Sequence, residues 1–156
     1  MGGVTFIPWD NQLAAMVREP GGVRIGDALT QAKKNLDVLK ASCLVGIDSN
    51  LQELEGLCAE GGRQAPDEIK LKIYHLSNDI LAVAGTFDLA ELGRAAFCLC
   101  EMVDRFRQLK QWNQAAVQVH LSAFKLLRHE TDPATQASVV EGLRKLVDSA
   151  ATIGES

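Results

Sequence analysis

The apolar residues of this chain recur at intervals of three and four over five long segments, which is the spacing of one face of an α-helix. The first segment begins near Asp27, a residue suited to the N-cap position, and the Gly61-Gly62 pair ends it. Gly46 and residues 48–50 are candidate positions for a bend within it. Its apolar stripe consists of Leu29, Ala32, Leu36, Leu39, Cys43, Ile47, Leu51, Leu54 and Cys58.

Four further helices are predicted from start signals and apolar stripes. The second extends from about Pro66 to Gly85-Thr86, and the third opens at Asp88 with a variant of the capping box. The fourth starts near Asn113, and residues 131–133 end it and start the fifth. Their stripes are Ile69, Ile73, Leu76, Ile80 and Val83; Leu92, Ala96, Leu99, Val103 and Phe106; Ala116, Val119, Ala123, Leu126 and Leu127; and Val139, Val140, Leu143, Leu146 and Val147. We interpret every stripe as core packing.

These patterns predict an all-α protein, a helical bundle of about five helices. No segment shows the sustained alternation of a strand flanked by hairpin turns. The link between the second and third helices is very short, so we expect helices over 67–85 and 89–109 to form a central antiparallel hairpin. We expect an irregular N-terminal segment over residues 1–26 that packs on the bundle, the bundle over 27–150, and a flexible tail over 151–156.

Composition and charge argue against several classes of partner. The formal net charge is -4, and no run of Lys or Arg exceeds two residues, so we expect no nucleic-acid binding. No apolar run approaches the length that crosses a bilayer, and no secretory signal is visible, so we expect no membrane association and a cytoplasmic location. These properties are those of an ordinary globular protein.

Cysteines and histidines are the candidate metal ligands of this sequence. Cys98 and Cys100 lie on a predicted helix, where two residues are about 200° apart around the axis, so they cannot hold one ion together. His120 and His129 are also on opposite sides of their helix, and we interpret both as structural or solvent-exposed. No phosphate-binding glycine loop, nucleophile elbow or metal motif is present. We therefore expect no metal, no cofactor and no enzymatic activity.

Residues 73–87 carry the most specific pattern of the chain. They read Ile-Tyr-His-Leu-Ser-Asn-Asp-Ile-Leu-Ala-Val-Ala-Gly-Thr-Phe. This stretch resembles the signature helix of the histidine-phosphotransfer (HPt) domains of bacterial phosphorelays. In that family the phosphorylated histidine is followed by lysine at +3, glycine at +4, glycine at +7 and an aromatic residue or leucine at +9. With Gly85 at +7 and Phe87 at +9, the histidine position falls on Asn78.

The pattern is closer still to an alphaproteobacterial branch of HPt-like proteins. Its members carry a His-Asp pair, a Gly/Ala-rich turn with Thr-Phe-Gly, and then a Ser-Leu-Cys helix. This chain has Asn78-Asp79, then residues 84–87 reading Ala-Gly-Thr-Phe, then residues 97–100 reading Phe-Cys-Leu-Cys. The resemblance covers most of the chain but is specific only over residues 73–100. It implies an HPt-like four-helix core and a response-regulator receiver domain or histidine kinase as partner.

Three positions depart from the family pattern, and two of them lack a group that phosphotransfer uses in the family. The family's histidine attacks an aspartyl phosphate through a ring nitrogen, whereas the amide nitrogen of Asn78 is conjugated with its carbonyl and is not a comparable nucleophile. Leu81 replaces a lysine that would offset phosphate charge one turn away. Ala82 replaces glycine and keeps nearly the same shape. The sequence thus retains a scaffold whose reactive chemistry has been removed.

His75 is an alternative phosphoacceptor. It lies one turn before Asn78 and about 60° to the side. If His75 accepted phosphate, Asp79 would stand at +4 and repel both the phosphate and the carboxylates of a partner. We therefore favour a surface or half-buried structural role for His75.

Three hypotheses remain open after the sequence has been read. The leading one is a phosphotransfer-inactive, HPt-like signalling module that binds a receiver domain or histidine kinase. Its expected partner-binding surface is Ser77, Asn78, Asp79, Leu81, Ala82 and Gly85, with Asn78 facing solvent. The second is an active phosphotransfer protein that uses His75. The third is a structural helical module for interaction or dimerisation, and a homodimer is compatible with each.

Overall fold

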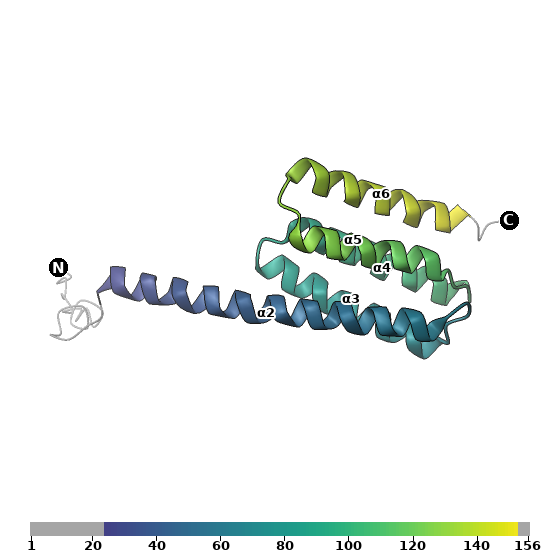
Figure 1. Cartoon of the computed structure of the whole chain (residues 1–156), viewed down its shortest axis with the longest axis horizontal. Coiled ribbons are helices and arrows are strands. Elements are labelled where there is room, and N and C mark those ends of the chain that lie inside the picture. The colour runs from purple at the N-terminus through teal and green to yellow at the C-terminus, as the bar shows by residue number, and fades with distance from the viewer. Residues whose placement is uncertain (1–23, 153–156) are drawn as a thin grey trace, which may run out of the picture. The chain divides into compact units, whose positions relative to one another are not determined.

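The computed structural model describes residues 24–152, and every regular element within this range is a helix (Figure 1). The helices are α2 (Ile25–Gly61), α3 (Asp67–Thr86), α4 (Ala90–Gln108), α5 (Gln114–His129) and α6 (Pro133–Thr152). The predicted all-α bundle is confirmed. The predicted N-terminal segment and C-terminal tail lie outside the described residues, apart from residues 24–26 and 151–152. None of the described helices is long and apolar enough to cross a membrane.

The chain divides into two units, Met1–Leu39 and Lys40–Ser156, so α2 contributes to both. In the second unit, α4 packs against α3, α5 and α6, and α5 also contacts α6. Two ion pairs join α5 to α2: Arg128 binds both carboxylate oxygens of Asp48 at 3.0 and 3.2 Å, and Lys125 contacts Glu55 at 2.5 Å. Residues 40–61 of α2 therefore belong to the same bundle as α3–α6.

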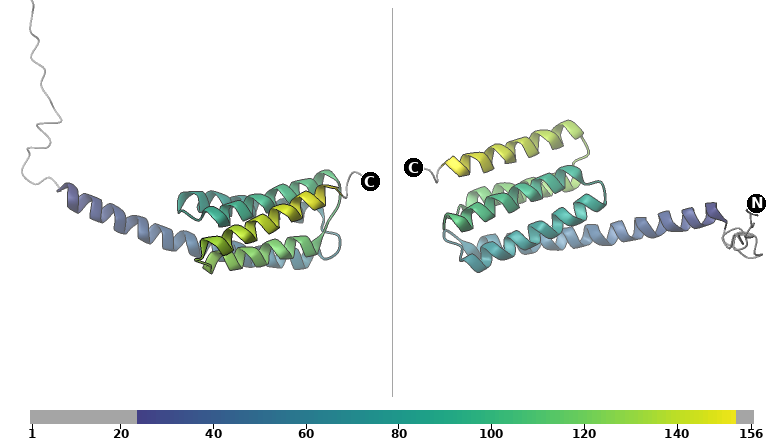
Figure 2. Two further views of the ribbon diagram at one scale, coloured as in Figure 1. Left: turned by 90° about the horizontal axis from the view of Figure 1, so that it is seen from above. Right: turned by 180° about the vertical axis from the view of Figure 1, so that it is seen from behind.

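The predicted α3–α4 hairpin is confirmed, and Figure 2 shows the two helices side by side in the view from behind. The turn between them differs from the prediction, because Asp88 does not cap α4. Asp88 has a φ of 58°, in the left-handed region, and Leu89 is the N-cap residue without a side-chain hydrogen bond. The backbone closes the turn instead, since Leu89 N–H donates to the Ala84 carbonyl at 3.1 Å. This tight turn holds the end of α3 against the start of α4.

The predicted starts of α5 and α6 are confirmed by their capping bonds. The side-chain oxygen of Asn113 accepts from the Ala116 N–H at 3.1 Å. The Asp132 carboxylate accepts from the N–H and the hydroxyl of Thr135, at 2.8 and 2.6 Å. The bonds from the two backbone N–H groups satisfy donors that have no partner within their own helices.

The predicted core is right for most stripes and wrong in two places. On α5, Val119 and Leu126 are 51% and 45% exposed, because the buried face is centred on Val117 and Phe124 instead. On α2, which runs through Gly46 and residues 48–50 without interruption, the early stripe is exposed. Spacing identifies an apolar face, but whether another element covers that face depends on packing.

Gly61 and Gly56 provide a matched test of packing at the end of α2. A Cβ on Gly61 would lie 2.8 Å from the Ala65 Cβ, whereas a Cβ on Gly56 would meet nothing within 4 Å. We expect Gly56→Ala to raise the free energy of unfolding by up to about 1 kcal/mol through helix propensity. In Gly61→Ala the same gain should be outweighed by overpacking against Ala65, which costs about 1–3 kcal/mol, so the free energy of unfolding should fall. Urea unfolding of both variants measures this, and equal shifts would show that the loop after α2 yields freely.

Candidate functional site

Asn78 is exposed on α3, as predicted, and its neighbours on the helix surface are exposed with it. Because each residue advances about 100° around a helix, Asn78, Ala82 and Gly85 share one face. Asp79 is also exposed, and Leu81 is half-buried. Five of the six residues expected at the partner-binding surface are therefore at least partly accessible.

Ser77 is the exception, and its assignment to the surface was wrong. Its side chain is fully buried, and its hydroxyl donates to the Ile73 carbonyl at 2.7 Å. Ser77 stands four residues after Ile73 and three before Ile80, so it lies on the core side of α3. The bond to its own helix satisfies the hydroxyl and allows a polar residue at this buried position.

His75 is exposed, so its ring is open to solvent. It contacts Tyr74 edge to face, with ring centroids 5.8 Å apart. Asp79 follows one turn later on the same helix and is also exposed. The spacing of four residues therefore places Asp79 one helical turn from His75, as the sequence indicated.

An apolar hollow of about 310 Å³ adjoins this face between α3, α4 and α6. Its lining residues are Leu81, Gly85, Ala90, Gly93, Arg94, Phe97 and Arg144. Phe97 is 49% exposed at the hollow. Gly93 permits the close approach of the helices, since a Cβ there would lie 3.4 Å from the Ala84 Cβ. Arg94 pairs with Glu91 at 3.0 Å, but its side chain remains 67% exposed.

Sequence reasoning named Leu81 and Gly85 but missed the two arginines of this hollow. Phe97 could have been recognised as a surface residue, because it lies outside the α4 stripe. Arg144 carries no such signal. It reaches the hollow from α6, and nothing local in the sequence pairs α6 with the end of α3.

The cysteines are packing residues. Cys58, Cys98 and Cys100 are buried, Cys43 is half-buried, and all four are free thiols. Burial raises the pKa of the Cys100 thiol to about 11, so it is protonated and a poor nucleophile at neutral pH. Within residues 24–152, no three His, Cys, Asp or Glu side chains lie close enough together to hold a metal ion.

His120 is fully buried on α5, whereas His129 is exposed. The Nδ1 of His120 lies 2.9 Å from the Ala116 carbonyl, so this nitrogen carries the proton and donates. The Nε2 of His120 has no hydrogen-bond partner. Burial lowers the pKa of His120, and the bond to Ala116 only partly opposes that shift. The imidazole is therefore held neutral inside the bundle.

Comparison of the chain with protein-family models, with curated proteins and with solved structures gives no significant match.

Burial of neutral His120 makes stability depend on pH. Below about pH 6.5 the unfolded chain protonates this histidine while the folded chain resists, so stability should fall as the pH drops. We expect urea midpoints to decrease between about pH 7.5 and about pH 5.5 more steeply in the wild type than in His120→Gln. His129→Gln is the control and should keep the wild-type slope. Equal slopes in all three proteins would mean that His120 titrates alike in both states.

Proposed function

We propose that the protein is a phosphotransfer-inactive, HPt-like adaptor that binds a response-regulator receiver domain or a histidine kinase. It binds through the α3–α4 face, which comprises Asn78, Asp79, Leu81, Ala82 and Gly85 of α3 together with Arg94 and Phe97 of α4. One observation carries the proposal. Asn78 is exposed on a helix face that adjoins an apolar hollow, and two arginines line that hollow.

The chemistry of Asn78 argues for binding without transfer. An exposed amide donates and accepts hydrogen bonds, but its nitrogen offers no lone pair comparable to that of an imidazole. The histidine of α3, His75, is exposed and has Asp79 one turn away. A carboxylate at that place repels an incoming phosphoryl group and the acidic site that would deliver it.

The hollow supplies the means of docking. Burying the exposed part of Phe97 and the accessible part of Leu81 would contribute about 25 cal/mol per Å² of apolar surface. Arg94 and Arg144 bring positive charge to the face at which Leu81 has replaced a lysine. Such a surface suits an acidic partner with an apolar patch. Micromolar affinity would suit a small, transient interface of this kind.

The adaptor hypothesis is tested by titrating the protein with purified receiver domains and histidine kinases of the same cell and measuring binding. We expect one of them to bind, and Phe97→Asp to weaken that binding about tenfold or more because it places a charge in the apolar contact. Val119→Asp is the matched control, since Val119 is equally exposed on α5. Binding that Phe97→Asp leaves unchanged, or that Val119→Asp also abolishes, would refute the α3–α4 face as the docking surface.

Phosphotransfer is followed separately with a phosphorylated receiver. We expect no acid-labile, base-stable label on the wild type. Label that disappears in His75→Gln would establish an active phosphotransfer protein and overturn the adaptor. Label gained only in Asn78→His would support the adaptor, because docking would then be intact and the nucleophile alone missing.

The early part of α2 favours a second candidate, a module for dimerisation. Ile25, Leu29, Leu36 and Leu39 are 80%, 66%, 58% and 52% exposed. Together with exposed Ala32 they follow alternating intervals of four and three, the seam of a two-stranded coiled coil. A continuous apolar stripe of this kind is uncommon on a monomer and marks an interaction surface.

Molar mass in solution tests this second candidate. We expect a dimer, and Leu36→Asp should dissociate it because a charge would enter the apolar seam. Val38→Asp is the control: Val38 is 66% exposed but lies about 200° around the helix from Leu36. A wild type that stays monomeric at high concentration would exclude the dimer. The adaptor hypothesis would be unaffected by that result.

A further inference from the structure

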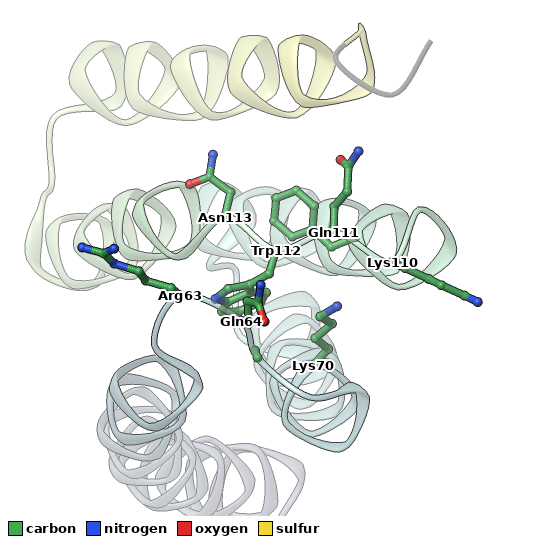
Figure 3. A pocket seen from close by; sticks show the side chains of 9 residues that line it. Arg63, Gln64, Lys70, Lys110, Gln111, Trp112 and Asn113 are labelled. Carbon is green, nitrogen blue, oxygen red and sulfur yellow. The ribbon is translucent and has the colours of Figure 1, made fainter. Parts of the chain in front are cut away.

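A second hollow lies at the opposite end of the α3–α4 hairpin from Gly85. It has a volume of about 650 Å³ and forms where the α2–α3 loop approaches the α4–α5 loop (Figure 3). Its lining includes Arg63, Gln64, Lys70, Lys110, Trp112 and Asn113. This volume is within the range of small-molecule sites in proteins.

The lining carries three cationic side chains and no carboxylate. Arg63, Lys70 and Lys110 form no ion pair with any residue of the described range 24–152. Two acids, Asp67 and Asp104, line an adjoining hollow together with Lys70 and Lys110. Asp67 is already bound by Arg107 through two hydrogen bonds of 3.0 and 3.1 Å, and Asp104 accepts a hydrogen bond from Gln108 at 2.7 Å. The bonds from Arg107 lower the pKa of Asp67, and Lys70 adds to the shift through charge alone. The positive charge at the hollow is therefore left without a directly bound counter-ion.

Lys70 is the most informative of the three, because it is only 6% exposed. The buried part of Lys70 is its aliphatic stem, because among the described residues its nitrogen is not one of the fully buried polar atoms that lack a hydrogen-bond partner. Figure 3 shows the Lys70 side chain rising toward the segment that carries Gln111 and Trp112, on the side of the hollow. A lysine whose stem is packed, whose ammonium reaches the hollow and which has no ion pair is placed to bind an anion.

The neighbouring groups complement such a ligand. The side-chain oxygen of Asn113 is occupied as the cap of α5, so its amide NH₂ remains as a donor. Trp112 is fixed by two contacts: its Nε1 donates to the Gly62 carbonyl at 2.9 Å, and its ring meets Phe106 edge to face. The indole is half-buried and thus offers a fixed apolar surface beside the cations.

We propose that this hollow binds a small phosphorylated ligand. The phosphate oxygens are held by Arg63, Lys70 and Lys110, and the Trp112 ring packs against whatever organic group the phosphate bears. The site is independent of the adaptor surface, because it lies at the first turn of α3 while Gly85 lies at the last.

Fluorescence of Trp112 reports binding directly. The chain has two tryptophans, so Trp9→Phe leaves Trp112 as the single emitter. This protein is titrated with pyrophosphate, with a nucleoside triphosphate, and with sodium chloride at matched ionic strength. We expect saturable changes with the phosphates and none with chloride. Tighter binding of the nucleotide would support packing of its organic part against Trp112. Equal binding would support the phosphate site but would overturn the contact between Trp112 and the organic group.

Charge-removing variants locate the binding. We expect Arg63→Gln and Lys70→Met each to weaken phosphate binding about tenfold, as loss of one partner of a close charge pair does. Arg63 is exposed, so its variant should fold normally, and Lys70→Met keeps the length of a buried side chain. Lys125→Gln, on the exposed surface of α5, is the matched control and should bind as the wild type does. A response that depends only on ionic strength, or saturable binding that neither Arg63→Gln nor Lys70→Met weakens, would overturn the proposal.

Discussion

The close packing of α3 against α4 determines where both candidate sites lie. The two helices contact each other along their length, and the backbone bond from Leu89 to Ala84 closes their turn with only a few residues. Gly93 lets the helices approach at this end. The same contact therefore shapes the apolar hollow beside Gly85 and, one hairpin length away, the cationic hollow at Lys70.

The charged residues that line the cationic hollow are not the ones that form the ion pairs of the described bundle. Arg128 binds Asp48 and Arg107 binds Asp67, each through two hydrogen bonds that link separate parts of the chain. Partly exposed pairs such as these contribute about 0–1 kcal/mol each, so their main effect is geometric. They hold neighbouring elements in register, and the pair with Arg107 also occupies Asp67, which stands in the same first turn of α3 as Lys70. The cation at Lys70 is thereby left available to a ligand.

Much of this fold could be predicted from the sequence because the signals are local. A stripe at intervals of three and four, with Asn113 or Asp132 before it, specifies a helix and its start within a few residues. The exposure of Asn78 followed from the same periodicity. Burial of Ser77 was also implied by its spacing from Ile73, although the resemblance to a surface motif suggested otherwise. The prediction that Asp88 caps α4 was wrong: the N-cap residue is Leu89, and a backbone hydrogen bond from Leu89 to Ala84 closes the turn.

The sequence alone therefore determined the helices and their order. Tertiary structure decided which apolar faces are covered: the stripe through Leu36 matches that of a core helix, yet it is exposed. It also decided that Arg144 joins Leu81 at one hollow and that Lys110 joins Lys70 at the other. The physical reason is the distance along the sequence over which each interaction acts. Helix formation depends on residues within one or two turns, whereas a site depends on which distant helices pack together, and many partners satisfy the same apolar stripe equally well.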